Sequence, residues 1–132
     1  MIVRGVIEDF PKLKIVASHG GGGICETISR MDYAYELQDE AFFLGPYAPM
    51  KIKKKPSEYM KMLYIDTVTY NEPAVKMVLD WVGPDHVLYG SDAPPLTSLK
   101  PRAIKLIQDL DVSAADKDKI FWHNARKLLK LN

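Results

Sequence analysis

Hydrophobic residues in this chain form short apolar runs that alternate with longer stretches in which apolar residues recur every three or four positions. Short runs of this kind are typical of buried strands, and the longer pattern is typical of amphipathic helices. Three strands are predicted, at residues 14–18, 63–68 and 87–89. Helices are predicted at 1–10, 24–37, 72–82, 99–110 and 117–131, with short helical turns at 56–59 and after Ser113, and a loop at 45–56.

The order of these elements is one helix, three strand–helix units and a final helix. Strands that alternate with helices pair in parallel, and the helices cover the sheet. All three predicted strands are short and apolar, as expected when both faces of a sheet are buried. The sequence therefore predicts an α/β fold built from parallel βα units.

Composition agrees with a single soluble domain over residues 1–132. The chain is 47% hydrophobic and 27% charged, and its 18 basic and 17 acidic residues give a formal net charge of +1. A near-neutral chain has no overall field that would attract nucleic acid or anionic lipid. Residues 1–5 lack the apolar stretch of a signal peptide, and no run approaches the ~20 residues of a membrane helix. We expect a cytoplasmic protein.

Two polar residues follow predicted strands. His19 comes directly after the first strand, and Asp92 follows the third in the sequence Gly90-Ser91-Asp92. In an α/β layer both would lie at the carboxyl edge of the sheet, where ligands bind and barrel enzymes keep their active sites. A His and an Asp that converge there can transfer protons or hold a metal. Each residue alone also has a structural interpretation. His19 would then be a polar group whose hydrogen bonds are satisfied within the fold, and Asp92 would only cap a helix or form an Asx-turn.

Four glycines, Gly20 to Gly23, follow His19. Glycine suits positions where φ is positive or where a ligand approaches the backbone, and free amides before a helix can hold an anion. A tight turn without a ligand explains the run equally well. A His-Gly-Gly-Gly run also occurs as an esterase oxyanion loop, but the Gly-x-Ser-x-Gly nucleophile motif which that enzyme needs is absent.

The other residues with catalytic chemistry have structural interpretations. His86 precedes a predicted strand, and His123 lies on the last predicted helix beside Trp122. Cys25 is the only cysteine, which excludes an internal disulfide and a cysteine-based zinc site. Neither histidine is expected to act in catalysis.

Several stretches together resemble the amidohydrolase-related family that includes aminocarboxymuconate-semialdehyde decarboxylase and γ-resorcylate decarboxylase. The resemblance covers nearly the whole chain in the family's order and spacing. The matching stretches are Phe10-Pro11-Lys12-Leu13-Lys14, Ser18-His19-Gly20-Gly21-Gly22, Tyr64-Ile65-Asp66-Thr67, residues 83–94 and Asn124-Ala125-Arg126-Lys127-Leu128-Leu129.

This resemblance implies a metal-dependent hydrolase or decarboxylase that acts on small carboxylated or cyclic substrates. The implied fold is a TIM (β/α)₈ barrel in which the present strands look like the sixth, seventh and eighth. The implied cofactor is one divalent ion, zinc or manganese. Asp92 would be a metal ligand and a catalytic residue, and His19 would be the catalytic acid–base group. Gly20 and Gly21 would be substrate-binding residues.

The sequence departs from the family pattern in two respects. Many members have a His after the seventh strand, where this chain places Tyr70 or Asn71, so these two are the candidate substrate-binding residues there. A full barrel needs about 250 residues, whereas three strands are predicted here. The first-strand ligand pair and the fifth-strand His ligand of the family have no counterpart.

The chain is therefore expected to be the C-terminal part of an incomplete barrel, working as a fragment or half-enzyme. Its partners would be a small-molecule substrate and either a complementing N-terminal half or further copies of itself. The alternative is a non-catalytic α/β interaction domain, or a decayed remnant, that self-associates through its open sheet edge.

Overall fold

The computed structural model describes residues 1–40, 50–94 and 97–131. The predicted loop over 45–56 is consequently described only from residue 50 onward, and its first part lies outside the described residues.

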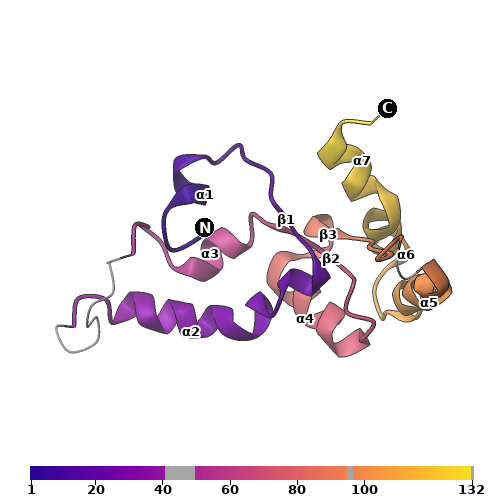
Figure 1. Ribbon diagram of the computed structural model, residues 1–132, viewed down its shortest axis with the longest axis horizontal. Coiled ribbons are helices and arrows are strands. Elements are labelled where there is room, and N and C mark those ends of the chain that lie inside the picture. Colours follow the sequence, from indigo (N-terminus) through magenta and orange to yellow (C-terminus); the bar gives the residue numbers. More distant parts are fainter. Residues whose placement is uncertain (41–49, 95–96, 132) are drawn as a thin grey trace.

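Three short strands form one parallel sheet at the centre of the molecule (Figure 1). They are β1 (Val16–Ala17), β2 (Tyr64–Asp66) and β3 (Val87–Leu88), in the spatial order β1-β2-β3. Ala17 pairs with Ile65, and Ile65 pairs with Val87, so the three strands end at nearly the same level. The parallel α/β class is confirmed, with strands shorter than predicted.

Two helices lie beside this sheet. α2 (Ile24–Glu36) follows β1, and α4 (Glu72–Val82) connects β2 to β3. Pro73 stands in the first turn of α4, where its missing N–H costs no hydrogen bond, and Gly83 ends the helix with a positive φ of 73°. α4 packs against β2 and β3 and also contacts α2. Both helices match the predicted ranges closely.

The remaining elements are shorter. They are α1 (Val6–Asp9), α3 (Pro56–Met60), α5 (Lys100–Asp109), α6 (Ala114–Asp118) and α7 (Asn124–Leu129), with 3₁₀ turns at His19–Gly21, Pro84–His86 and Thr97–Leu99. Ser113 caps α6, as predicted, by accepting a hydrogen bond from the Asp116 N–H at 3.1 Å. Among the described residues, no helix has the length and apolar character that a bilayer crossing requires.

One predicted helix is shorter than expected, and another is helical as predicted but changes its hydrogen-bond pattern partway. The first is helical only over Val6–Asp9, because Gly5 adopts a left-handed conformation with φ of 78°. The last contains a π-helical stretch, Lys119–His123, between α6 and α7. The Ile120 carbonyl in this stretch accepts a hydrogen bond from the Tyr89 N–H at 2.8 Å, which joins the last helices to the end of β3.

The core forms around the central strands. Ile65 of β2 and Val87 of β3 are fully buried. Apolar side chains from the helices and from the π-helical stretch surround them. Among these, Ile28, Met60, Val75, Ile107 and Ile120 are each no more than 1% exposed.

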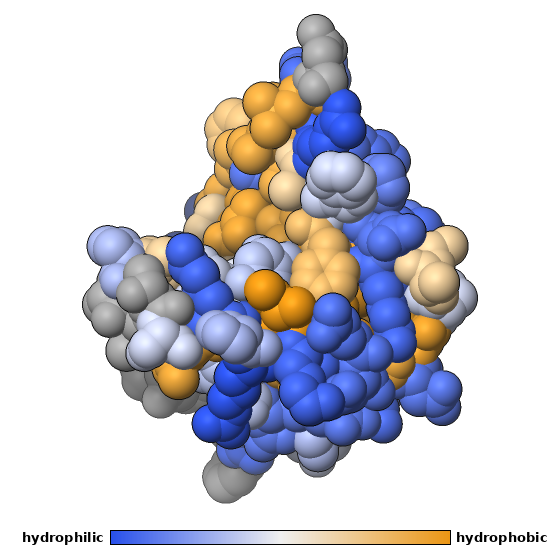
Figure 2. All heavy atoms as spheres, turned by 90° about the vertical axis from the view of Figure 1, so that its right-hand side faces the viewer, coloured by the Kyte–Doolittle hydropathy of each residue, from blue (hydrophilic) through white to orange (hydrophobic). Residues whose placement is uncertain are grey.

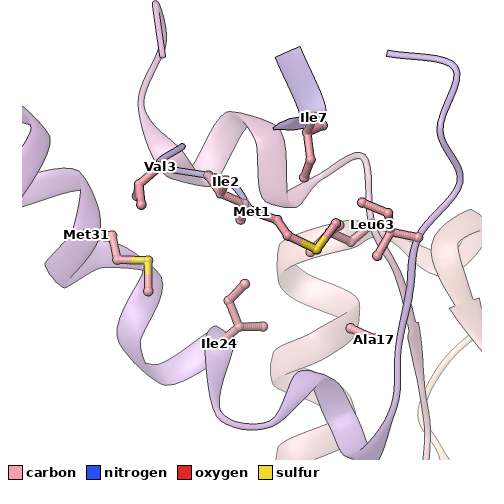
Figure 3. Close-up of a pocket in the computed structure, with 9 residues that line it drawn as sticks. Met1, Ile2, Val3, Ile7, Ala17, Ile24, Met31 and Leu63 are labelled. Carbon is pink, nitrogen blue, oxygen red and sulfur yellow. The ribbon is translucent and has the colours of Figure 1, made fainter. Parts of the chain in front are cut away.

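Apolar surface remains at both sides of the sheet. Within the described chain β1 pairs only with β2, and Val16 on this edge is 49% exposed. Beside it lies an open hollow of about 300 Å³ (Figure 3), lined by Met1, Ile2, Val3, Ile7, Ile15, Ala17, Ile24, Met31 and Leu63. On the other side Trp122 and Leu129 are exposed, and the face that carries α5 and α7 shows hydrophobic patches between hydrophilic ones (Figure 2). Both sides have the character of surfaces that pack against a neighbour.

Asn124 supports the junction of α7 with β3. The side chain is 4% exposed, and its Nδ2 donates to the Pro84 carbonyl at 2.7 Å and to the Val87 carbonyl at 2.8 Å. We expect Asn124→Ala to lower the free energy of unfolding by about 2–3 kcal/mol in urea denaturation, because two carbonyls lose their donor. Lys127→Ala on the same helix is exposed and should change it by less than about 0.5 kcal/mol. Equal effects of the two substitutions would contradict this role.

Cys25 at the start of α2 is 6% exposed, and burial raises the pKa of its thiol from 9.0 to about 11. The native thiol should therefore react with a disulfide reagent at pH 8 at least about a hundredfold more slowly than in urea, since the thiolate is the reactive form. The thiol is neutral in the fold, so its contribution to stability is present below pH 9 and is lost as the pH rises toward 11. Equal labelling rates in buffer and in urea would show that Cys25 is accessible.

Candidate active site at the carboxyl ends of the strands

His19 lies in a left-handed turn that joins β1 to α2. The φ angles of His19 and the four glycines that follow are all positive, from 54° to 82°. Only glycine adopts this conformation without strain, which explains the glycine run. The turn leaves the His19 side chain 67% exposed at the carboxyl edge of the sheet.

Asp92 reaches the same edge from the loop after β3. Its Oδ1 lies 3.6 Å from His19 Nε2, and its side chain is 26% exposed. This distance is too long for a hydrogen bond but close enough for electrostatic attraction. The predicted convergence of these two side chains is thus present in the structure.

Tyr70 joins them from the loop after β2. Its hydroxyl oxygen is buried and has no hydrogen-bond partner within the described residues. Burial is the largest cause that raises the pKa of this hydroxyl, and the charge of the nearby Asp92 carboxylate raises it further. Asn71, the other candidate at this position, is exposed and precedes the first turn of α4. Tyr70 is therefore the residue of the two that lies beside Asp92.

A backbone feature unites the three residues. His19, Tyr70 and Asp92 have φ angles of 54°, 52° and 54°, and each follows a different strand. Such conformations are uncommon outside glycine and cluster at functional sites. The positive φ angles could not be predicted from the sequence, because His, Tyr and Asp mostly adopt other backbone conformations.

Three of the four glycine amides in this run have hydrogen-bond partners. The Gly20 N–H donates to Asp66 Oδ1 at 2.9 Å. The N–H groups of Gly21 and Gly22 donate to the carbonyls of Ser18 and His19. Asp66 and two carbonyls of the turn therefore occupy three of the donors that an anion cradle in this run would use.

The sequence did not indicate two other residues at this edge as site residues, although both belong to the stretch Tyr64-Ile65-Asp66-Thr67. Asp66 ends β2, and Thr67, which is 1% exposed, follows it. Thr67 Oγ1 accepts a hydrogen bond from the Gly90 N–H at 3.2 Å. Only the fold brings these side chains to the loops that carry His19 and Asp92.

The remaining histidines lie away from this edge. His86 Nδ1 is 3.1 Å from the Leu63 carbonyl oxygen, and its ring stacks on Tyr64 at a centroid distance of 4.6 Å. His123 is exposed beside Trp122. These contacts agree with the structural interpretation of His86 and give His123 no place at the site.

The donor types at the site suit a divalent metal, but their number does not. An imidazole nitrogen and a carboxylate oxygen are ligands for zinc and manganese. A catalytic site takes about three protein ligands. In the part of the chain that the structure describes, no group of three or more His, Cys, Asp or Glu side chains could hold an ion. His19 and Asp92 therefore form an incomplete ligand set.

Comparison with known proteins gives consistent matches. The model of the family described as Amidohydrolase matches residues 1–131. A 2-amino-3-carboxymuconate-6-semialdehyde decarboxylase of Dictyostelium discoideum is 30% identical over all of this chain and 35% of its own length. A gamma-resorcylate decarboxylase of Polaromonas sp. is 28% identical over 97% of this chain and 37% of its own length. The chain spans about a third of the length of these relatives.

Solved structures agree in fold. A 5-carboxyvanillate decarboxylase from Sphingomonas paucimobilis superposes with a TM-score of 0.82 at 27% identity, over 100% of this chain and 38% of its own. A dihydroxybenzoic acid decarboxylase from Polaromonas sp. JS666, solved with manganese and the inhibitor 2-nitroresorcinol, has a TM-score of 0.78 at 25% identity, over 99% of this chain and 38% of its own. The small parallel sheet fits part of a larger (β/α)₈ barrel.

Gly20 and Gly22 provide a matched test of the left-handed turn. Their φ angles are 61° and 58°, but a Cβ on Gly20 would lie 2.3 Å from Thr69 Cγ2, whereas one on Gly22 would meet nothing within 4 Å. We expect Gly22→Ala to lower the free energy of unfolding by about 1 kcal/mol through backbone strain alone. Gly20→Ala should cost about 1–3 kcal/mol more because of overpacking. Thermal unfolding of both variants measures the difference, and equal losses would show that Thr69 yields freely.

Proposed function

Because the chain belongs to the amidohydrolase family, as its resemblance indicated, we propose that it forms part of a metal-dependent decarboxylase or hydrolase of small carboxylated compounds. The observation that carries this proposal is the convergence of His19 and Asp92, from loops after two different strands, in a chain that the family model matches over residues 1–131. Decarboxylation is the favoured reaction, since the relatives and structures named above are decarboxylases. In this proposal β1, β2 and β3 take the sixth, seventh and eighth places of the barrel.

His19 is proposed as the acid–base group. Loss of carbon dioxide leaves an electron pair on the substrate carbon, which must take up a proton, and hydrolysis requires a proton to be removed from water. Imidazole serves both tasks near neutral pH. The 67% exposure of His19 lets its ring reach a substrate at the carboxyl edge of the sheet.

Asp92 is proposed as a ligand that this chain contributes to a divalent metal, with the remaining ligands supplied by parts of the enzyme outside the described residues. A bound ion would supply positive charge that stabilises negative charge on the substrate. Manganese is supported by the bound ion of the dihydroxybenzoic acid decarboxylase. Zinc stays a prediction from the resemblance.

Tyr70 is the proposed substrate contact of the loop after β2. Its buried hydroxyl has no hydrogen-bond partner among the residues that the structure describes, so it can donate to a carboxylate or phenol oxygen of a substrate beside Asp92. Contacts of Gly20 and Gly21 with a substrate stay a prediction. Their N–H groups are engaged, so only backbone surface without side chains remains to face a ligand. Asn71, exposed at the start of α4, likewise stays a prediction.

Apolar surface on both sides of the sheet supports a complementing part as the partner. The relatives are about three times as long as this chain, and their additional residues would cover the hollow beside β1 and the exposed side chains near α7. The alternative, a non-catalytic domain that self-associates through its open edge, would cover the same surface. It gains no support from the named relatives, each of which is an enzyme.

The test is the metal content of the untagged protein in its native assembly, purified without chelators and measured by elemental mass spectrometry. We expect about one manganese or zinc per chain, retained by His19→Asn and lost by Asp92→Asn, because a catalytic site depends on each of its few ligands. His19→Asn should lower the decarboxylation rate by at least about a hundredfold.

Exposed residues of the same types provide matched controls. Asp80→Asn and His123→Asn should leave metal content and rate unchanged, since both side chains lie on the surface outside the site. Equal metal loss in the His19 and Asp92 variants would show that their roles are wrongly assigned. An assembly without metal would contradict a metal-dependent reaction.

A further inference from the structure

The end of β2 touches both loops of the candidate site. Asp66 is the last residue of this central strand, and its Oδ1 accepts hydrogen bonds from the Gly20 N–H at 2.9 Å and the Val68 N–H at 3.0 Å. The bond to Val68 is local and shapes the turn after the strand. The bond to Gly20 crosses 46 positions of sequence and reaches the residue directly after His19.

This long-range bond acts where the backbone most needs support. His19 and Gly20 both have positive φ, with angles of 54° and 61°, and the Gly20 N–H belongs to the peptide group between them. A histidine rarely adopts this conformation unless its surroundings enforce it. A carboxylate that accepts from this N–H forms a charge-assisted hydrogen bond, which is stronger than a bond between neutral groups. Asp66 therefore fixes the peptide from which the His19 side chain departs.

Thr67 makes the corresponding contact on the other side of β2. Its buried hydroxyl accepts from the Gly90 N–H at 3.2 Å, and its own N–H donates to the Leu88 carbonyl at 3.0 Å. Gly90 stands two residues before Asp92. A Cβ on Gly90 would lie 2.3 Å from Val68 Cγ2 and 3.3 Å from Asp66 Cβ. The Asp92 loop can therefore lie against the end of β2 only because residue 90 is glycine.

We propose that Asp66 and Thr67 are positioning residues that hold the two loops of the site in place. Two consecutive residues of the central strand each bind one loop, and together they set the 3.6 Å approach of His19 Nε2 to Asp92 Oδ1. Their relevance to catalysis depends on the proposed function of His19 and Asp92, whereas the hydrogen bonds themselves can be tested without it.

Amide hydrogen exchange of the ¹⁵N-labelled chain tests each contact separately. Asp66→Ala should accelerate exchange at Gly20 by at least about tenfold, which corresponds to about 1.4 kcal/mol, and leave Gly90 unchanged. Thr67→Val should accelerate exchange at Gly90 by a similar factor and leave Gly20 unchanged. In Asp66→Ala the ring signals of His19, whose loop depends on the lost bond, should also shift.

Conservative variants and buried amides in other elements show whether Asp66 and Thr67 each position one loop or stabilise the whole fold. Asp66→Asn and Thr67→Ser keep an acceptor, so they should restore part of the protection at Gly20 and Gly90 that the Ala and Val variants lose. The amides of Ile28 in α2 and Val78 in α4, both buried, should keep their exchange rates in all four variants. Should Asp66→Ala fail to fold, Asp66→Asn carries the test through an intermediate change at Gly20. A uniform acceleration at every amide, or no change at Gly20 and Gly90, would overturn the proposal.

Kinetic measurements on the native assembly test the effect of Asp66 on catalysis. There Asp66→Ala should lower kcat at least about tenfold with KM within about twofold, because misplacing a proton-transfer group affects the reaction more than substrate binding. Asp66→Asn should recover most of kcat. Unchanged kcat in Asp66→Ala would overturn the positioning role. A wild-type assembly with no metal and no turnover would contradict the proposed function instead, and the exchange results would still decide whether the two contacts exist.

Discussion

Parallel pairing of three short strands is the constraint on which the other features of this molecule depend. Because β1, β2 and β3 run in the same direction and end at nearly the same level, the loops that leave them meet at one edge. His19, Tyr70 and Asp92 lie far apart in sequence, and each enters this edge from a different strand. An antiparallel arrangement would place alternate loops at opposite edges and separate the same three side chains.

Sequence pattern predicted the elements whose ends carry explicit signals. α4 begins beside Pro73 and ends at Gly83, and its buried residues Val75, Val78 and Val82 repeat at helical spacing. The first and last helices were predicted less well, because their apolar periodicity continues through Gly5 and through the π-helical stretch Lys119–His123. A left-handed glycine ends a helix and a π turn changes the hydrogen-bond pattern within one, and the spacing of apolar residues in the sequence reveals neither.

Part of the site could be predicted from two criteria, namely residue type and position after a strand. Those criteria identified His19 and Asp92, whose side chains lie 3.6 Å apart. They did not identify Asp66, which accepts a hydrogen bond from the Gly20 N–H, 46 positions away. They also suggested free amides in the glycine run, whereas Asp66 accepts from the Gly20 N–H and carbonyls of the turn accept from those of Gly21 and Gly22. Contacts that form only through tertiary structure leave no local mark on the sequence.

The incomplete ligand set and the exposed apolar surface have one common explanation. In a (β/α)₈ barrel each strand supplies both a neighbour for the next strand and a loop for the catalytic face. If the three strands of the described residues form part of such a barrel, both the exposed edge at Val16 and the missing metal ligands are expected. In such a barrel the strands and helices that would bury the exposed edges also carry the loops that would add the missing metal ligands. A partner that covers the edges would therefore also supply ligands. In the proposed enzyme, the complementing part would therefore continue the sheet beside β1 and present its own loops at the edge occupied by His19 and Asp92.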